Sequence, residues 1–203
     1  MAVFFYKSIN VIIDSGFACE ICDVKSKEIT AFDKSVYKDN TIIVLWSDHG
    51  WHLGDKNHWK KFALWEETTH VPMLIVAPGI TKPEQKCDRV VGSIDLYPTL
   101  LELCGFEPNN TLDGQSLVPL LKDPTKEWDF PVLTTHSRGY NAIRTEKWRY
   151  IQYPKDGEAE LYDRENDPGE NVNIAQQHAD VVQKLTQRLF VKMREVVRSS
   201  HAQ

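Results

Sequence analysis

The feature that most constrains this chain is a short apolar run that ends in a group of strong ligands. Residues 41–46 are all β-branched, leucine or aromatic, and polar turn residues flank them on both sides. An apolar run of this length between turn signals predicts a strand buried on both faces, as in a parallel sheet. Asp48 and His49 follow directly, and Gly50 lets the backbone turn. Ligands of open α/β sheets bind beyond the carboxyl ends of the strands, so this corner is the first candidate site.

The segment after this strand has an unusual composition. Four of the seven histidines fall between residues 49 and 70. Tryptophans and lysines share the segment: Trp51, Trp59, Trp65, Lys56, Lys60 and Lys61. Aromatic walls, cations and imidazoles together suit a pocket for an anionic, partly apolar substrate. The alternative is a polar loop with solvated histidines, and composition alone does not decide between the two.

Charge, hydropathy and cysteine usage exclude several classes of protein. The net charge of −5 and the lack of a basic block argue against nucleic acid as a partner. No apolar run approaches the ~20 residues of a membrane span. Cys19 and Cys22 have C-x-x-C spacing, but no second pair follows, so we expect neither a closed zinc site nor a disulfide scaffold. Lys7 and Asp14 interrupt the first apolar runs, so no signal peptide is predicted.

Hydrophobic patterns predict the elements that follow the first strand. Residues 71–77 form a second apolar run that Pro78 and Gly79 end, which predicts another strand. Residues 93–105 have helical spacing of their leucines, and Asp95 is the expected cap of that helix. A turn and a short apolar helix are predicted within residues 112–121.

The last third of the chain predicts a small separate sheet and a long helix. Short alternating runs with turn signals between them predict antiparallel strands within residues 132–136, 142–153 and 160–163. Residues 178–198 carry one apolar stripe at helical spacing. The chain therefore divides into an atypical N-terminal segment (1–32), an α/β core (33–121) and a C-terminal subdomain (122–203).

Several short motifs occur together in one order along this sequence. They are residues 47–54 (SDHGWHLG), 59–61 (WKK), 69–72 (THVP), 95–100 (DLYPTL), 112–114 (LDG), 142–145 (AIRT) and 160–163 (ELYD). Together they resemble the C-terminal metal-site segment of type I sulfatases, in particular the iduronate-2-sulfatase-like branch, over residues 36–198. The resemblance implies part of an alkaline phosphatase/sulfatase-like α/β fold. It has a central sheet with helices, then a small C-terminal antiparallel sheet and a helix.

The resemblance also implies an activity and roles for single residues. The family hydrolyses sulfate esters of sugars or other alcohols with a divalent metal, normally Ca²⁺. Asp48 and His49 match two metal ligands, and Lys61 matches the catalytic lysine that contacts the substrate sulfate. A hard cation prefers carboxylate oxygens, whereas a histidine ligand alone would favour a transition metal. Following the family, we expect calcium.

Four more residues are candidates for contacts with the substrate. Trp51, His58 and His136 are expected to line the pocket, and the guanidinium of Arg138 suits a sugar carboxylate. For each of them a packing or surface role is the competing interpretation.

The sequence departs from the family in its catalytic nucleophile. The family makes a formylglycine from the cysteine of a C-x-P-S-R or similar motif, and none of the four cysteines stands in such a context. The paired aspartates of the family's N-terminal half are also missing. We therefore expect a C-terminal fragment that is inactive alone. Such a fragment would bind metal or anions weakly or pair with a separate N-terminal half.

Two further expectations concern the reaction and the location. A phosphomonoester or phosphonate hydrolase on the same scaffold is the alternative enzyme class. The family is usually exported to the periplasm or the lysosome, and its partner is a sulfated sugar or another sulfate ester.

Overall fold

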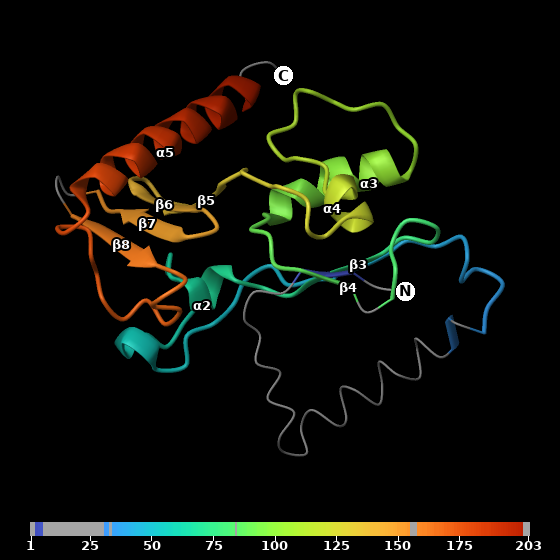
Figure 1. Ribbon diagram of the computed structural model, residues 1–203, viewed down its shortest axis with the longest axis horizontal. Coiled ribbons are helices and arrows are strands. Elements are labelled where there is room, and N and C mark those ends of the chain that lie inside the picture. The colour runs from blue at the N-terminus through green and yellow to red at the C-terminus, as the bar shows by residue number, and fades with distance from the viewer. Residues whose placement is uncertain (1–2, 6–30, 33, 84, 155–157, 201–203) are drawn as a thin grey trace.

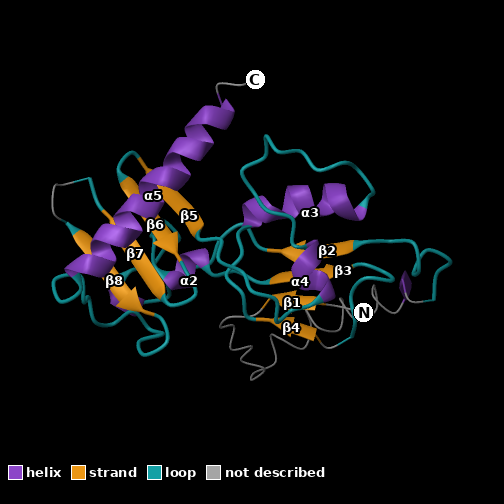
Figure 2. Ribbon diagram, turned by 45° about the horizontal axis from the view of Figure 1, so that its top comes forward, coloured by secondary structure: helices purple, strands orange, loops and turns teal. Residues whose placement is uncertain are grey.

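The computed structural model describes residues 3–5, 31–32, 34–83, 85–154 and 158–200. Two four-stranded sheets stand beside each other in this part of the chain, with α2 between them (Figure 1). Helices α3 and α4 accompany the first sheet, and the long helix α5 crosses the second (Figure 2). The expected order of an α/β part followed by a small antiparallel sheet and a helix is confirmed.

The first sheet has the strand order β2-β3-β1-β4. Its strands are β1 (Val3–Phe5), β2 (Ile43–Trp46), β3 (Met73–Val76) and β4 (Gln85–Cys87). Strand β3 runs antiparallel to both β1 and β2, whereas β1 and β4 are parallel. The expected second apolar strand is therefore β3, which lies inside the sheet.

The prediction that residues 41–46 form a strand buried on both faces of a parallel sheet is wrong. Strand β2 pairs antiparallel with β3, with Trp46 opposite Met73, and it stands at the edge of the described sheet. Leu45 is 43% exposed and Trp46 is 52% exposed. The burial of a strand depends on its neighbours on both sides, and the described residues supply only one neighbour for β2.

Short helices accompany the two sheets. The 3₁₀ turn Ser93–Asp95 and the helices α3 (Leu96–Leu103) and α4 (Val118–Lys122) pack on the first sheet. Helix α2 (Glu66–Thr69) lies between the sheets, and the 3₁₀ turn Asp55–Asn57 lies beside the second. The core between sheet and helices includes Ile75, Leu117, Leu120 and Leu121. Asp95 occupies the predicted N-cap position of α3, but its side chain makes no capping hydrogen bond to that helix. Its carboxylate instead accepts hydrogen bonds from the backbone N–H groups of Gly92 (2.8 Å) and Gln115 (2.7 Å).

The second sheet is a meander with the strand order β5-β6-β7-β8, all antiparallel. The strands are β5 (Val132–Ser137), β6 (Tyr140–Arg144), β7 (Trp148–Gln152) and β8 (Ala159–Asp163). Helix α5 (Ala179–Ser200) packs Leu185 and Leu189 against Ile143, Tyr150 and Leu161. The predicted strands and terminal helix of this part are confirmed.

A buried ion cluster joins the two parts of the fold. Glu66 at the start of α2 meets Arg144, Arg149 and Arg164 of the second sheet and the loop that follows it. The Arg144 Nε lies 3.3 Å from Glu66 Oε2, and the Arg164 Nη2 lies 3.1 Å from Glu66 Oε1. Glu170 is a second acid in the cluster, with its Oε1 2.7 Å from the Arg149 Nε. We call these five residues the junction cluster.

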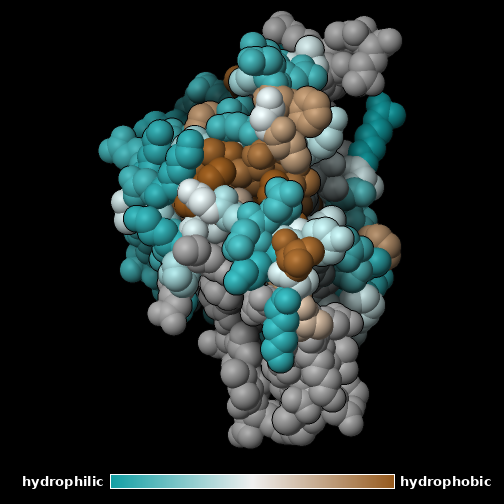
Figure 3. Space-filling model, turned by 90° about the vertical axis from the view of Figure 1, so that its right-hand side faces the viewer, coloured by the Kyte–Doolittle hydropathy of each residue, from teal (hydrophilic) through white to brown (hydrophobic). Residues whose placement is uncertain are grey.

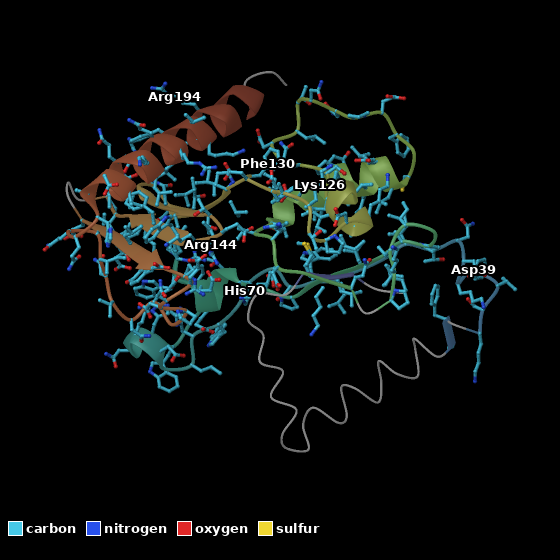
Figure 4. The ribbon with its side chains drawn as sticks, in the orientation of Figure 1. Asp39, His70, Lys126, Phe130, Arg144 and Arg194 are labelled. Atoms are coloured by element: carbon cyan, nitrogen blue, oxygen red, sulfur yellow. The ribbon has the colours of Figure 1, made fainter. Side chains whose placement is uncertain are left out.

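The pKa values of the two acids in the junction cluster are shifted in opposite directions. Burial alone would raise the pKa of Glu66, but the charges of Arg149, Arg144 and Arg164 outweigh burial and lower it well below its usual range. Burial raises the pKa of Glu170, and its arginine neighbours only partly oppose that. His70, at the end of α2, lies beside Arg144 at this junction (Figure 4). Burial lowers the pKa of His70.

The surface shows two further features. No helix in the described ranges is long and apolar enough to cross a membrane.

At the end of the molecule that carries the first sheet, apolar side chains gather in one area, surrounded by polar ones (Figure 3). An apolar area of this kind is typical of a surface that contacts another chain segment.

Candidate active-site corner

The structure brings Asp48, His49 and Lys61 together just beyond the end of β2. The Lys61 Nζ lies 2.9 Å from the His49 Nε2, and that nitrogen lies 3.7 Å from the Asp48 Oδ2. Because both distances are measured from the same nitrogen, His49 Nε2, the Lys61 amine and the Asp48 carboxylate oxygen are at most 6.6 Å apart. The Asp48 side chain is 83% exposed, so the corner is open to a ligand. Lys61, which is 12 positions from His49 in the sequence, thus lies on the same surface as Asp48 and His49 after β2.

Hydrogen bonds fix the tautomer of His49. Its Nδ1 lies 2.8 Å from the backbone oxygen of Gly50, which can only accept, so Nδ1 carries the proton. The lone pair is then on Nε2, the nitrogen that faces Lys61 and Asp48. An Nδ1–H bonded to a carbonyl with the lone pair on Nε2 is the arrangement of a metal-ligating histidine, and here that lone pair accepts a hydrogen bond from the Lys61 amine.

Gly50 holds this corner close to α2. Its backbone N–H donates to the Thr68 carbonyl at 2.9 Å. A Cβ at this position would lie 2.0 Å from the Glu67 carbonyl oxygen, so only glycine fits. His49 is therefore set by a close approach between the loop and a helix that also carries Glu66 of the junction cluster.

Lys56 ties the same loop to the C-terminal subdomain. Its amine donates a hydrogen bond to the backbone oxygen of Glu170. The amine also lies 4.9 Å from the ring centre of Tyr162 and 5.4 Å from that of Trp65. Lys56 itself has a φ of 54°, a left-handed conformation that is strained for a lysine. These contacts compensate for the strain, and they link the corner to the second sheet.

A cluster of packed aromatic rings lies around His52 in this loop. His52 is fully buried, and its ring packs edge-on at 5.3 Å from His58 and 5.6 Å from Trp65. Neither ring nitrogen of His52 has a hydrogen-bond partner among the described residues, nor does the His58 Nε2. Burial and then the nearby His58 lower the pKa of His52. The candidate substrate contact His58 thus belongs to a packed ring cluster.

The other three candidate contacts are on the surface. Trp51 is exposed, and its ring centre lies 6.1 Å from that of His49. His136 and Arg138 are exposed at the tip of the β5–β6 hairpin. His136 approaches the corner through Phe62, whose ring centre lies 5.4 Å away. Phe62 was not predicted as a site residue, although its position next to Lys61 was a usable signal.

The metal site is incomplete within the described ranges. No group of three or more histidine, cysteine, aspartate or glutamate side chains there is arranged to hold a metal ion. Asp48 and His49 supply one carboxylate and one imidazole. Calcium prefers ~6–8 oxygen ligands, so these two residues fit a part of such a site.

Comparison with protein families decides what kind of chain this is. A family profile described as N-sulphoglucosamine sulphohydrolase, C-terminal, matches residues 49–196 of the 203. The chain belongs to the sulfatase family. The matched range of this sulfatase chain starts at His49 and includes Lys61, the junction cluster and most of α5.

Curated relatives support this assignment. The sulfatase chain is 40% identical over 147 residues to a sulfatase of Formosa agariphila. This alignment covers 72% of this chain and 29% of the relative. It is 33% identical over 165 residues to arylsulfatase K of Canis lupus familiaris, covering 74% of this chain and 30% of the relative. The chain thus spans about a third of the length of these relatives. The sulfatase family is confirmed, whereas the iduronate-2-sulfatase-like branch is not.

Solved structures confirm the expected sulfatase-like fold. The protein BT4656, solved in complex with its substrate D-glucosamine-2-N,6-O-disulfate, superposes with a TM-score of 0.76 at 26% identity. The match covers 88% of this sulfatase chain and 39% of that protein. The phosphonate monoester hydrolase SpPMH of Silicibacter pomeroyi superposes with a TM-score of 0.75 at 27% identity, over 88% of this chain and 40% of the other.

Proposed function

We propose that this chain supplies the sulfate- and metal-binding corner of a sulfatase that hydrolyses sulfate esters of sugars. The observation that carries the proposal is the meeting of Asp48, His49 and Lys61 beyond β2, inside or beside the range that matches the family. A carboxylate, an imidazole lone pair and an ammonium within one open corner suit a cation and a sulfate that bind next to each other.

Each residue of the corner has a distinct task in this proposal. Lys61 places a fixed positive charge against a sulfate oxygen, where it stabilises charge that develops as the ester bond breaks. Asp48 and His49 would hold a divalent metal, which we propose is Ca²⁺. When bound, such a metal polarises the sulfate and neutralises its charge. The remaining ligands and the nucleophile are proposed to come from the part of the family fold that this chain does not span.

The proposed substrate is a sulfated sugar that also carries a carboxylate. The solved relative BT4656 has a disulfated glucosamine as its substrate, which supports a sugar in this family. Arg138 is exposed at the tip of the β5–β6 hairpin and has a guanidinium fork suited to a carboxylate. A sulfated uronic acid, as in iduronate-2-sulfatase, combines both groups.

A second enzyme class has specific support. The superposition with a phosphonate monoester hydrolase is as good as that with BT4656. Sulfate and phosphonate esters share tetrahedral oxyanions, and a cation with a lysine can bind either. The order of affinities for the two anions separates the classes.

We predict that Lys61→Met weakens the binding of 4-nitrophenyl sulfate by about 10- to 100-fold, because a hydrogen bond to a charged group contributes about 1.5–3 kcal/mol. The measurement is calorimetric titration with calcium present. Lys60→Met is the matched control, because Lys60 is exposed and adjacent. Equal losses in both variants would show that only general charge attracts the anion. Tighter binding of a 4-nitrophenyl phosphonate ester than of the sulfate would favour the second class.

A further inference from the structure

A groove runs along helix α5 on the side that faces the first part of the fold. Its volume is about 1200 Å³, and its lining extends along α5 from Val181 to Lys192. The loop between α3 and α4 and the segment before β5 form its other walls. Phe130 of that segment lies between α5 and α4 (Figure 4). The stretch of α5 that lines this α5 groove spans roughly 16 Å, which gives room for about three turns of a second helix.

Apolar side chains in the α5 groove are exposed. Phe130 is 43% exposed and Val191 is 56% exposed, and Leu112 and Trp148 are partly exposed beside them. The ring centre of Phe130 lies 4.7 Å from that of the buried Trp128, which holds the Phe130 ring in place. Exposed apolar side chains that share one groove are typical of a surface that binds another chain segment. A ring that is already held in place loses little side-chain entropy when a partner binds.

Three cations form a row on the α5 wall of the groove. Lys184, Arg188 and Lys192 line it at four-residue spacing. Residues at this spacing lie on one face of a helix, about 6 Å apart along its axis. The two acids of the lining, Asp113 and Asp129, come from the other walls. The α5 wall is therefore basic, and this asymmetry fixes which flank of a bound segment should be acidic.

One cation of this row is paired across the groove. The Arg188 Nη2 lies 2.9 Å from the Asp129 Oδ1, and the two side chains are 38% and 87% exposed. Water screens an ion pair that is this exposed, so the pair contributes little to stability. A carboxylate of a bound partner can therefore take the place of Asp129 beside Arg188.

We propose that the α5 groove binds an amphipathic α-helix of another protein, with acidic residues along the flank that meets α5. Carboxylates one turn apart on such a helix have the same spacing as the row of cations. Its apolar stripe would contact Phe130 and Val191, as in other complexes in which a helix lies in a groove. The backbone groups of α5 bond within their own helix, so a bound segment has to satisfy its own backbone, as a helix does. This interaction is separate from the proposed function at the corner after β2.

The test uses a synthetic acidic helix as the probe. A fluorescent peptide of about 18 residues, long enough to form a helix in water, would carry a leucine stripe and glutamates at every fourth position of one flank. Fluorescence anisotropy is followed while this chain is added. We expect saturable binding that weakens about tenfold or more when glutamines replace the glutamates. Lys184→Glu should weaken binding of the acidic peptide by about fivefold or more, and a peptide with lysines in place of the glutamates should bind this variant more tightly than it binds the native sequence.

Two matched controls separate the groove from the rest of the surface. Lys122→Glu makes the same change of charge at an exposed position of α4 outside the groove, and it should leave binding unchanged. Val191→Asp should weaken binding by about tenfold, because it places a charge in the apolar contact. Phe190→Asp, at the neighbouring exposed position of α5 outside the lining, should not.

Three outcomes of these titrations would overturn the proposal. They are no saturable binding of the acidic peptide, an equal loss in Lys184→Glu and Lys122→Glu, and an equal loss in Val191→Asp and Phe190→Asp. Sedimentation equilibrium tests the other possible occupant, a second copy of this chain. A dimer of the native sequence that becomes a monomer in Val191→Asp would show that a second copy fills the groove, and it would likewise overturn the proposal.

Discussion

Replacement of Glu66 by alanine is expected to lower the free energy of unfolding by about 3–5 kcal/mol, the cost of removing one partner from a buried ion pair. Glu66 is buried and meets three buried arginines from the other part of the fold. Without Glu66, Glu170 would still pair with Arg149 and Arg164, whereas Arg144 would lose its ion pair with Glu66. The midpoint of urea unfolding, followed by tryptophan fluorescence, measures the loss.

The matched control is Glu67→Ala, because Glu67 is exposed beside Glu66 in the same short helix. It should change the free energy of unfolding by less than about 0.5 kcal/mol. Because the pKa of Glu66 is lowered on folding, its stabilising effect is full at neutral pH and is lost as the pH falls below the ordinary value of 4.5. The gap between the native sequence and Glu66→Ala should therefore shrink in acid. A gap that is small at pH 7, or that grows in acid, would contradict this description of the junction cluster.

The second large effect concerns turnover. We expect these 203 residues alone to show no calcium-dependent hydrolysis of 4-nitrophenyl sulfate, although whole enzymes accelerate such reactions by about a million-fold or more. Sulfatase chemistry proceeds through a covalent nucleophile that splits one difficult step into two. None of the four cysteines stands in a context that resembles the formylglycine motif. Cys87 is buried, and burial raises the pKa of its thiol, which makes it a poor nucleophile.

The control for that assay is Asp48→Ala, measured with and without calcium. Calcium-dependent turnover by the native sequence that disappears in Asp48→Ala would show a nucleophile within this chain. Turnover that is the same in both proteins would point to a contaminating enzyme.

Local sequence patterns predicted the positions of the helices and strands well, but they did not predict which strands are neighbours or how deeply each strand is buried. The strand before Asp48 and His49 was predicted correctly from its apolar run, yet the prediction that both of its faces are buried was wrong. Whether β2 is an edge or an interior strand depends on residues far away in the chain. The second sheet was predicted because each of its strands alternates and ends in turn residues, and its meander needs only neighbouring segments to pair.

The contacts that join the two parts were beyond sequence reasoning. Glu66 and Arg149 are 83 positions apart, and Phe62 and His136 are also remote in sequence. No periodicity links residues at such separations. The resemblance to sulfatases assigned roles to Asp48, His49 and Lys61, but it gave no reason for Phe62 or the junction cluster. Their contacts arise from the packing of the segment after β2 against the second sheet.

The most direct test of the central claim is the linkage between calcium and sulfate ester at the corner of Asp48, His49 and Lys61. Calorimetric titrations would measure calcium affinity with and without 4-nitrophenyl sulfate, and sulfate affinity with and without calcium. We predict weak calcium binding that tightens when the ester is present, and an equal gain in the reverse titration, since such coupling is reciprocal. Asp48→Asn should remove the coupling, whereas Asp39→Asn, at an exposed position on the far side of the first sheet (Figure 4), should not. Calcium and sulfate that bind independently, or coupling that survives in Asp48→Asn, would contradict the assignment of this corner.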